Sequence, residues 1–502
     1  MRLAHACRAW LTPVRYDVSI MSIPRAAFPV ADPKLLLDAQ RSAFLEEGFV
    51  SDRVRRDRLT RAIDLLVSHE AQICEAVASD FGQRPASLTR FMDIFPAVHA
   101  LKFARKNLKR WMKPLPRTLG FPNLAPGSSA EIAYQPLGVV GVISPWNFPV
   151  TLTFGPLAGI LAAGNRCMIK PSELTPRTSE LLSKLVGMFF DSLEVTVVTG
   201  GQEVAESFAR LPFDHLLFTG STQVGRRVMA AAAEHLVPVT LELGGKCPVI
   251  IGRSANLARA VDRVMLGKLA NAGQVCLAPD YVCVPRNSVD AFVDEARKWT
   301  KNAYPGLPAN TDYTSLISVR HLQRTEELLA DARTHGAQII ELSESGSSPI
   351  EHRHMKVMAP ALILHATGQM RVMREEIFAP LLPVLPYDEL DAVISDIQRG
   401  ERPLALYYFG ADKSEERKIL ERTLSGGVTV NDIAMHFLAE ELPFGGVGAS
   451  GLGAYHGVHG FRRFSHARAV FRQSRLDIAG LIGLRPPYGA RLRRCLGWFI
   501  RR

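Results

Sequence analysis

The sequence predicts an α/β fold built from two successive α/β domains with largely parallel sheets. Its 502 residues are 47% hydrophobic and 22% charged, which is ordinary globular composition and enough material for two or three domains. Short runs rich in valine and isoleucine alternate with helical stretches along most of the chain. Such alternation is typical of parallel strands that are connected by helices.

A helical segment precedes this alternation. Apolar residues spaced three and four positions apart predict helices within 35–44, 58–77 and 91–111. Residues 1–32 are expected to be an extension outside the fold, because positions 1–20 carry three arginines, one acid and no continuous apolar signal core. A transit peptide and an unstructured stretch ahead of a second start at Met21 both fit this pattern.

The first α/β domain, counted with its helical lead-in, is predicted to cover 33–241, and the second to cover 242–430. In the first domain, strands are expected at 138–143, 167–169, 195–198, 215–218 and 239–241. In the second, strands are expected at 248–251, 281–284 and 404–409, and a helix at 257–271. Glu242 stands where the chain passes from one domain to the other.

The chain becomes glycine-rich after residue 431, with seven glycines between 445 and 460. This predicts a loop that approaches another backbone closely, and we assign 431–470 to a return segment. The remaining tail, 471–502, is basic and amphipathic. One helical face of it carries Leu492, Cys495, Leu496, Phe499 and Ile500, with arginines around them. An anionic membrane surface and a partner subunit fit this face equally well.

The net charge of +11 is concentrated at the two ends of the chain. Residues 1–20 carry +2 and residues 485–502 carry +6, which leaves +3 for the body. A nearly neutral body has no stripe of basic and aromatic residues for nucleic acid, so we expect no such partner. The seven cysteines are odd in number and scattered, which predicts reduced thiols, and no run reaches the roughly 18 apolar residues of a membrane span. We therefore expect a cytoplasmic protein.

Three residues are candidates for chemistry. Cys276 lies between Gly273 and Pro279, residues that interrupt helices and strands, so its thiol is expected on a loop. A lone cysteine, however, is more often an inert core residue. Glu242 ends an apolar strand, where a carboxylate is costly unless it has a task or an ion-pair partner. Asn147 follows a strand between two prolines that fix its backbone, and a simple turn would give the same pattern.

Other segments follow strand ends in the manner of a Rossmann-like dinucleotide-binding domain. Gly220, Ser221 and Gly225 open a helix, where free amides can hold a pyrophosphate. Lys170 and Glu173 lie where adenosine ribose hydroxyls would be in reach. Each of these patterns is weak alone, and so are the adjacent acids in 373–380, the segment that contains Glu376 and Phe378.

Taken in order, these motifs resemble the aldehyde dehydrogenase superfamily over about 33–470. The segments 442–457 and 461–466 resemble its class-3-like branch, and 91–95 and 106–114 are most similar to bacterial coniferyl aldehyde dehydrogenases. The resemblance implies a nucleotide-binding domain, a catalytic domain and a small oligomerisation arm, in a homodimer. One visible departure is Cys247, where the family more often carries serine or asparagine.

The resemblance also implies roles for individual residues. Cys276 would be the nucleophile, Glu242 the general base and Asn147 the oxyanion donor, while Glu376 and Phe378 would lie at the cofactor. We expect NAD to be preferred and NADP tolerated, because Glu173 can accept a ribose 2′-hydroxyl and Lys170 softens the repulsion of a 2′-phosphate. The expected reaction oxidises an aldehyde to the carboxylic acid through a cysteine thioester.

The substrate is expected to be an aromatic aldehyde or phenylpropenal such as coniferyl aldehyde. Fatty or medium-chain aldehydes are the alternative, because the facing of residues that line a substrate tunnel cannot be determined from one sequence. Transfer of the acyl group to coenzyme A is disfavoured by the presence of Glu242 as a hydrolytic base. A non-catalytic binding protein on the same fold would be expected to have lost the three candidate residues.

Overall fold

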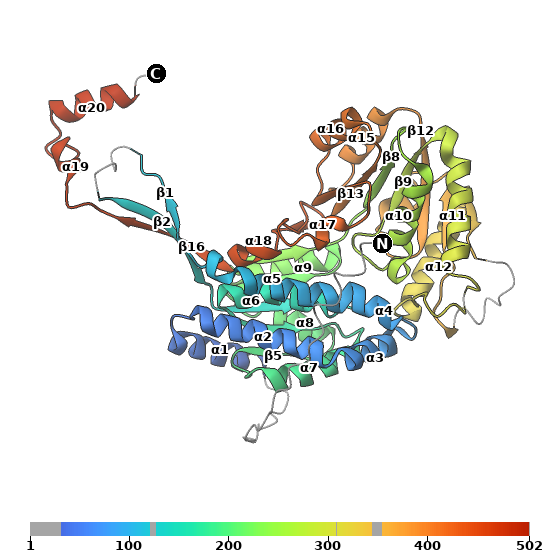
Figure 1. The fold of residues 1–502 in the computed structure, drawn as a ribbon, viewed down its shortest axis with the longest axis horizontal. Coiled ribbons are helices and arrows are strands. Elements are labelled where there is room, and N and C mark those ends of the chain that lie inside the picture. Colours follow the sequence, from blue (N-terminus) through green and yellow to red (C-terminus); the bar gives the residue numbers. More distant parts are fainter. Residues whose placement is uncertain (1–31, 121–126, 308, 344–353, 501–502) are drawn as a thin grey trace, which may run out of the picture.

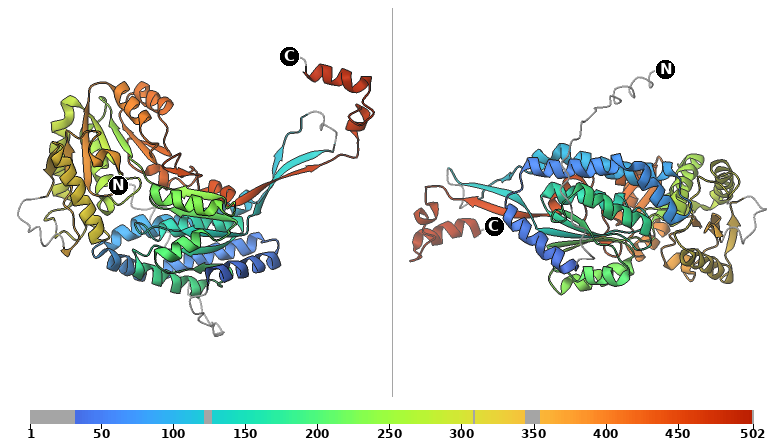
Figure 2. Two further views of the ribbon diagram at one scale, coloured as in Figure 1. Left: turned by 180° about the vertical axis from the view of Figure 1, so that it is seen from behind. Right: turned by 90° about the horizontal axis from the view of Figure 1, so that it is seen from below.

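A computed structural model describes residues 32–120, 127–307, 309–343 and 354–500. Figures 1 and 2 show a body made of two α/β halves and a thin arm that extends away from it, with the last helices at the tip of the arm. Nearly all of the predicted extension, 1–32, lies outside the described residues. No helix in the described ranges is both long and apolar enough to cross a bilayer.

The N-terminal helices are α1 (Pro33–Glu47), α2 (Asp52–Ser68), α3 (Glu70–Phe81), α4 (Ala86–Thr89) and α5 (Phe95–Trp111). The prediction of continuous helical pattern over 58–77 was wrong at one point, because α2 and α3 meet at His69. The His69 ring lies 3.1 Å from the Leu65 carbonyl near the end of α2, where a helix leaves its carbonyls without amide partners. A π-helical turn, Arg90–Ile94, joins α4 to α5.

The first sheet has the strand order β15-β7-β6-β3-β4-β5. Its parallel strands are β3 (Val139–Ile143), β4 (Arg166–Lys170), β5 (Val195–Val197), β6 (His215–Thr219) and β7 (Val239–Glu242). All five were predicted. The helices that connect them are α6 (Thr151–Ala163), α7 (Pro176–Phe189), α8 (Gln202–Ala209) and α9 (Thr222–Ala233). The order reverses between β3 and β6, and in such sheets ligands bind at the carboxyl ends of the strands beside that point.

The second sheet has the order β10-β11-β12-β9-β8-β13-β14 and is parallel except at its β10 edge. Its strands are β8 (Pro248–Ile251), β9 (Tyr281–Pro285), β10 (Gln338–Glu341), β11 (Ala361–Leu364), β12 (Leu381–Tyr387), β13 (Ala405–Phe409) and β14 (Gly427–Val430). Its helices are α10 (Leu257–Leu269), α11 (Val289–Ala303), α12 (Val319–Thr334), α14 (Arg371–Arg374), α15 (Leu390–Arg399) and α16 (Lys413–Arg422). Only β8, β9 and β13 were predicted.

The predicted helix 257–271 is too long by two residues. It ends at Leu269, because Asn271 and Ala272 adopt left-handed backbone angles with φ of 50° and 53°. Asparagine tolerates this conformation better than most residues do. The left-handed turn directs the chain into the loop that carries Cys276.

The arm is a three-stranded antiparallel sheet of β1 (Leu115–Arg117), β2 (Ser129–Pro136) and β16 (Ser465–Arg472). The predicted boundary at 470 therefore falls inside β16. Before it, the glycine-rich segment forms α17 (Met435–Leu438), β15 (Gly451–Leu452), which pairs antiparallel with β7, and α18 (Gly457–Arg463). A Cβ at Gly159 of α6 would lie 3.0 Å from the backbone of Gly460, which confirms the predicted close approach. The division into domains at 241 and 430 stays a prediction.

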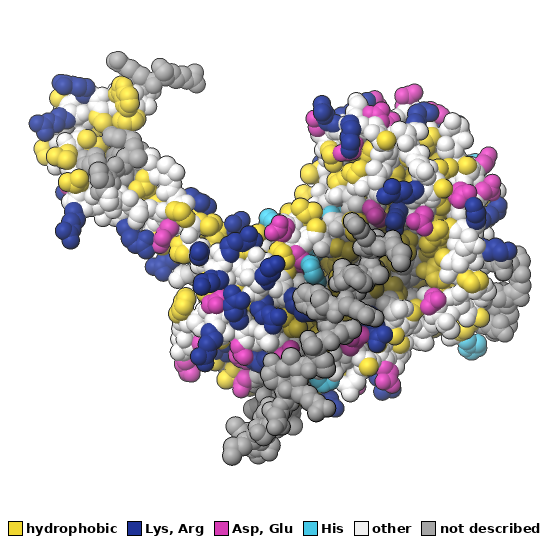
Figure 3. Space-filling model, in the orientation of Figure 1, with side chains coloured by type: hydrophobic (Ala, Val, Ile, Leu, Met, Phe, Trp, Pro, Cys, Tyr) yellow, Lys and Arg dark blue, Asp and Glu magenta, His cyan; other side chains and the backbone are white. Residues whose placement is uncertain are grey.

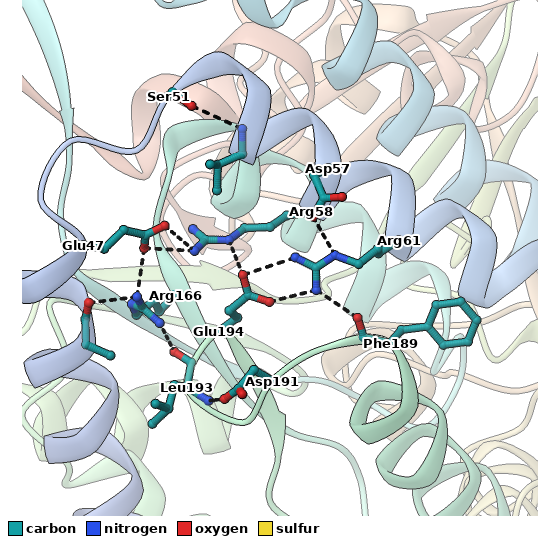
Figure 4. Close-up of polar contacts among 12 residues, drawn as sticks. Glu47, Ser51, Asp57, Arg58, Arg61, Arg166, Phe189, Asp191, Leu193 and Glu194 are labelled. Carbon is teal, nitrogen blue, oxygen red and sulfur yellow. Dashed lines mark hydrogen bonds and ion pairs between the residues drawn. The ribbon is translucent and has the colours of Figure 1, made fainter. Parts of the chain in front are cut away.

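A network of charges fastens the N-terminal helices to the first sheet (Figure 4). Arg58 of α2 is 2% exposed, and its guanidinium lies 2.8 Å from Glu47 and 2.9 Å from Glu194. Arg61 bonds the other oxygen of Glu194 at 2.8 Å, and Arg166 at the start of β4 bonds Glu47 at 2.8 Å. Each carboxylate is thus shared between two arginines. These residues form a network of charges rather than isolated surface ion pairs.

Candidate active site

The predicted cofactor and catalytic segments meet in one cleft of about 1920 Å³ at the carboxyl edge of the first sheet. The loops that follow β3, β4, β6 and β7 all line it. Residues of the second half close the other side. The lining includes nine predicted residues: Asn147, Lys170, Glu173, Gly220, Ser221, Glu242, Cys276, Glu376 and Phe378.

The loop after β6 has the features of a phosphate-binding turn. Ser221 is the N-cap of α9, and its hydroxyl accepts a hydrogen bond from the Val224 N–H at 3.4 Å. Gly225 is the exception among the predicted residues, because it lies behind the cleft wall. A Cβ there would stand 2.7 Å from the Leu243 side chain, so Gly225 allows α9 to pack closely on the strand end. The contact that the structure shows for Gly225 is packing, and its role at the cofactor stays a prediction.

Lys170 and Glu173 lie together past the end of β4. The Lys170 ammonium is 3.7 Å from the Glu173 carboxylate and donates to the Pro171 carbonyl at 2.6 Å. Burial lowers the pKa of Lys170, with Glu173 opposing the shift. Glu173 is about half exposed and open to a ligand in the cleft.

The Cys276 loop is fixed from below by the Gln274 side chain. The Gln274 amide donates to the Asn271 carbonyl at 2.9 Å and to the Ser315 carbonyl at 3.1 Å, and its oxygen accepts from the Ile317 N–H at 2.9 Å. Every polar atom of this buried side chain is therefore used. The loop is held rigidly enough to present one thiol orientation to the cleft.

The surroundings of Cys276 favour the protonated thiol over the thiolate. Burial, followed by the nearby carboxyl groups of Glu376 and Glu242, raises its pKa to about 12. Hydrogen bonds from the N–H groups of Cys276 and Leu277 oppose that shift. Because a thiolate is the reactive form, the site needs a base or an added positive charge to become reactive.

Two carboxyl groups line the cleft with this thiol. Glu242, at the end of β7, is 2% exposed, and neither of its oxygens has a hydrogen-bond partner among the described residues. Burial raises its pKa well above the usual range, although Arg463 opposes the shift. Glu376 accepts from the Gly245 N–H, and burial together with Asp280 raises its pKa to about 8. A side chain at Gly244 would collide with the Glu376 carboxyl group.

Asn147 is 4% exposed and points at the Cys276 loop. Its amide donates one hydrogen bond to the Gln274 carbonyl at 3.1 Å. Because a side-chain amide carries two N–H groups, a second donor remains for an oxygen near the thiol. Its backbone carbonyl accepts from Arg84 at 2.7 Å and from Asn271 at 3.3 Å.

Arg84 and Asp93, which were not predicted from the sequence, hold the Asn147 loop. Both side chains are fully buried, with 3.1 Å between guanidinium and carboxylate. The other Asp93 oxygen accepts from the N–H groups of Val150 and Thr151 at 2.9 and 2.7 Å, at the start of α6. The sequence feature that could have revealed this pair is the acidic residue Asp93 within the otherwise apolar segment 91–95.

A second missed pair, Lys246 and Asp280, joins the connection between β7 and β8 to the segments on the second-half side of the cleft. The Lys246 ammonium bonds Asp280 and also donates to the Val372 carbonyl at 2.7 Å. Asp280 in turn accepts from the Ile377 N–H at 2.9 Å, which fixes the segment carrying Glu376 and Phe378. The Phe378 ring stands edge-on to Trp146 with 5.5 Å between centroids, at the cleft wall.

A two-sheet α/β body, with a strand-end nucleotide cleft and a loop thiol, defines the class of dinucleotide-dependent enzymes that act through a cysteine. The sequence matches the aldehyde dehydrogenase family over residues 20–470. A probable coniferyl aldehyde dehydrogenase of Caulobacter vibrioides is 51% identical, with 93% of this chain and 96% of the relative covered. A coniferyl aldehyde dehydrogenase of a Pseudomonas strain is 49% identical, with 90% and 93% covered.

Solved structures agree with this relationship. The substrate-bound state of Staphylococcus aureus AldH is 34% identical with a TM-score of 0.86, covering 93% of this chain and 100% of that one. A Mycobacterium tuberculosis aldehyde dehydrogenase complexed with NAD+ is 27% identical with a TM-score of 0.78, covering 89% and 91%. The chain belongs to the aldehyde dehydrogenase family, which confirms the predicted fold class. It is an NAD(P)-dependent oxidoreductase that acts on the aldehyde group.

The residues at the cleft fit a nicotinamide dinucleotide. The N-capped start of α9 suits a pyrophosphate, and Lys170 with Glu173 suits the adenosine ribose. The unpartnered buried carboxyl group of Glu242 and the thiol lie at the other end of the same space. When bound, the dinucleotide supplies the hydride acceptor of the reaction.

Proposed function

We propose that this enzyme oxidises an aromatic aldehyde of the phenylpropenal type, such as coniferyl aldehyde, with Cys276 as the nucleophile. The observation that carries the residue roles is the meeting of Cys276, Asn147 and Glu242 in one cleft, on loops from both halves of the body. The substrate class is supported by the relatives that are named coniferyl aldehyde dehydrogenases. Fatty or medium-chain aldehydes are the competing class.

Each residue has a separate task in the proposed reaction. Cys276 loses its proton and its sulfur bonds the aldehyde carbon, while the free N–H of Asn147 and the backbone N–H of Cys276 stabilise the oxyanion that forms. Oxidation of this adduct removes a hydride from the former aldehyde carbon, for which the bound dinucleotide would be the acceptor, and the oxyanion becomes the carbonyl of a thioester on Cys276. Glu242 then takes a proton from the water that attacks this thioester, and the carboxylic acid leaves.

The environment of Glu242 suits a general base. A carboxyl group with a pKa raised by burial holds a proton more strongly than one in water does, and base strength near the working pH favours proton transfer. Such a base contributes roughly 100-fold to 10,000-fold. Because neither oxygen is bonded within the described chain, both are available to water.

Two variants and a substrate screen test this proposal. Cys276→Ser is expected to abolish dehydrogenase activity, whereas Glu242→Gln is expected to accumulate an acyl-enzyme that intact-protein mass spectrometry would detect. Full activity in either variant would refute the assigned roles. A screen of arylpropenals against long-chain aldehydes by NADH production, at matched concentration, decides the substrate class.

We propose that NAD is preferred and NADP tolerated. The half-exposed Glu173 carboxylate can accept a ribose 2′-hydroxyl and repels a 2′-phosphate, while Lys170, 3.7 Å away, partly offsets that repulsion. Glu173→Gln is expected to shift the ratio of kcat/KM values toward NADP. A wild-type enzyme that strongly prefers NADP would contradict this assignment.

We also propose a homodimer in the cytoplasm. The arm stands away from the body with the long edges of its sheet open, which suits contact with a second copy (Figures 1 and 2). The six cysteines of the described ranges are free, which supports a reducing compartment. Light scattering coupled to size-exclusion chromatography tests the dimer, and a variant lacking 465–502 is expected to be monomeric.

The C-terminal helices α19 (Ile478–Leu481) and α20 (Ala490–Ile500) form the tip of the arm. Apolar and basic side chains gather there (Figure 3), and Leu481, Trp498 and Ile500 are at least 69% exposed. We propose that this tip is a docking surface, with an anionic membrane and the partner subunit as its two candidate occupants. Sedimentation with anionic liposomes of the full chain and of a truncation after Leu484 separates them. Lipid binding that is lost on truncation and weakened by salt supports the membrane.

A further inference from the structure

A second cavity, of about 170 Å³, lies beside the first turn of α6. Helix α6 contributes to both spaces, because Leu152 lines the cleft and Thr151 and Gly155, one turn apart, line the cavity. The loop just before α6 carries Asn147. The α6 part of the cavity wall therefore begins four residues after Asn147 in the chain, and none of the residues that line the cavity also lines the cleft.

Tyr455 connects the cavity to the reacting groups. It is 1% exposed, lines the cavity, and lies near enough to the titratable groups of Glu242, Cys276 and Glu440 for each to influence its pKa. The aromatic side chains of Phe95 and Phe437 line the same space. A flat ring that enters from the thiol side would thus meet aromatic walls on its way to Glu440.

One end of the cavity is polar, which a site for purely apolar ligands would not require. Glu440 is 8% exposed, accepts from the Gly457 N–H, and has the His99 ring 3.8 Å from one oxygen. His456 is 6% exposed, and its Nδ1 has no hydrogen-bond partner among the described residues. The His456 ring stacks on Phe444 at 5.2 Å between centroids, so its orientation is fixed. A buried carboxyl group and a buried unpartnered nitrogen both favour a ligand with a hydroxyl group.

We propose that this cavity binds the ring of a hydroxyl-bearing aryl aldehyde and that Glu440 and His456 select the substrate by hydrogen bonding its ring hydroxyl. The inference rests on the proposed oxidation of arylpropenals. Glu440 and His456 would discriminate among such aldehydes, a role that membership of the family does not assign to them. A cavity of roughly 150 Å³ accommodates benzene, so the observed volume suits one substituted ring.

An unsubstituted ring or a hydrocarbon chain would fit less well. Filling the cavity with it would remove water from Glu440 and His456 without replacing the lost hydrogen bonds. A site built to bond a substrate hydroxyl rejects the analogue that lacks it for this reason. The wild-type enzyme is therefore expected to prefer the hydroxylated aldehyde over its unsubstituted analogue by about 10-fold to 100-fold in kcat/KM.

The test compares 4-hydroxycinnamaldehyde with cinnamaldehyde in the wild-type enzyme and in Glu440→Leu, Glu440→Gln and His456→Phe. The ratio of the two kcat/KM values is expected to fall about 10-fold or more in Glu440→Leu and by less in Glu440→Gln, which keeps a hydrogen-bonding group. Glu441→Gln is the matched control. The Glu441 carboxylate is next to Glu440 in the sequence but is 77% exposed, so the ratio of kcat/KM values in this variant is expected to match that of the wild type.

The outcomes separate this inference from the substrate class on which it rests. If the wild-type enzyme oxidises neither aldehyde, the proposed substrate class fails. If it oxidises both without preferring the hydroxylated one, or if Glu440→Leu lowers both values by the same factor, the selection by Glu440 is refuted and the substrate class stands. Should Glu440→Leu fail to fold, the ratio measured with Glu440→Gln and His456→Phe decides in the same way.

Discussion

Replacement of Arg84 should damage catalysis through Asn147, a residue that it reaches only by the backbone. The Arg84 guanidinium donates to the Asn147 carbonyl at 2.7 Å and pairs with Asp93 at 3.1 Å, and both charged side chains are fully buried. In Arg84→Met, Asp93 is left without its cationic partner. Breaking such a buried pair costs about 3–5 kcal/mol of folding free energy.

The catalytic effect has its own magnitude. If the Asn147 amide stabilises the oxyanion, losing that donor costs about 100-fold to 1,000-fold in kcat. Arg84→Met displaces the donor rather than removing it, so its effect on kcat is expected to be no larger than that of Asn147→Ala. Substrate KM should change less than kcat, because the oxyanion forms only after binding.

A double-mutant cycle of Arg84→Met and Asn147→Ala tests the connection. Urea unfolding of all four proteins measures stability, and steady-state kinetics below the unfolding transition measures kcat. If Arg84 acts by positioning Asn147, adding Arg84→Met to Asn147→Ala should lower kcat little further. Multiplicative losses in kcat would show that the two residues act independently and would refute the positioning role.

Three further predictions concern single residues. Asn147→Ala should lower kcat by about 100-fold to 1,000-fold with the fold intact, as circular dichroism would show; a loss in KM alone would contradict the oxyanion role. Burial and Asp280 raise the pKa of Glu376 to about 8 from the ordinary 4.5, so the folded protein binds a proton at Glu376 more tightly than the unfolded chain does. The resulting contribution to the free energy of unfolding is complete below about pH 4.5 and is lost as the pH rises through 8. Denaturant unfolding at pH 5 and pH 8.5 should therefore show a smaller difference in Glu376→Gln than in the wild type. Glu194→Gln removes hydrogen bonds to Arg58 and Arg61 and should cost about 2 kcal/mol at pH 7. Although burial opposes it, bonds from Arg61 and Arg58 lower the pKa of Glu194, so the variant's deficit should shrink as pH falls through that lowered pKa.

The sequence predicted those parts of the molecule that leave a local pattern. All five parallel strands of the first sheet were found, because buried parallel strands are short apolar runs between helices. Glu242 and Asn147 were singled out because they lie at or after strand ends, and Cys276 because it lies on a loop marked by glycine and proline; their catalytic roles stay predictions. Strands β10, β11, β12 and β14 were missed, since their runs lie among loops and proline-bearing segments without a clear alternation.

Residues that act through distant partners left no such pattern. Arg84 lies in the loop before α4 and Asp93 in the π-helical turn nine positions later, and only the folded chain brings them to the Asn147 loop and the start of α6. Gly225 matched a phosphate-loop spacing, and in the structure the absence of a side chain at this position leaves room for the Leu243 side chain. Glu440 and His456 stand in a glycine-rich stretch, where the direction of a side chain depends on backbone angles that the sequence does not reveal.

The same burial that hides these residues sets the resting state of the active site. Burial raises the pKa values of Cys276, Glu242 and Glu376 together, so all three groups hold their protons more strongly than they would in water. Because each carboxylate raises the pKa of the thiol, Cys276 cannot be activated merely by ionising its neighbours. A positive charge entering the cleft acts in the opposite direction on all three groups. The arrangement therefore couples thiol reactivity to occupation of the nucleotide site, and thiol alkylation should be faster when a positively charged nicotinamide dinucleotide is bound than when the site holds its uncharged reduced form.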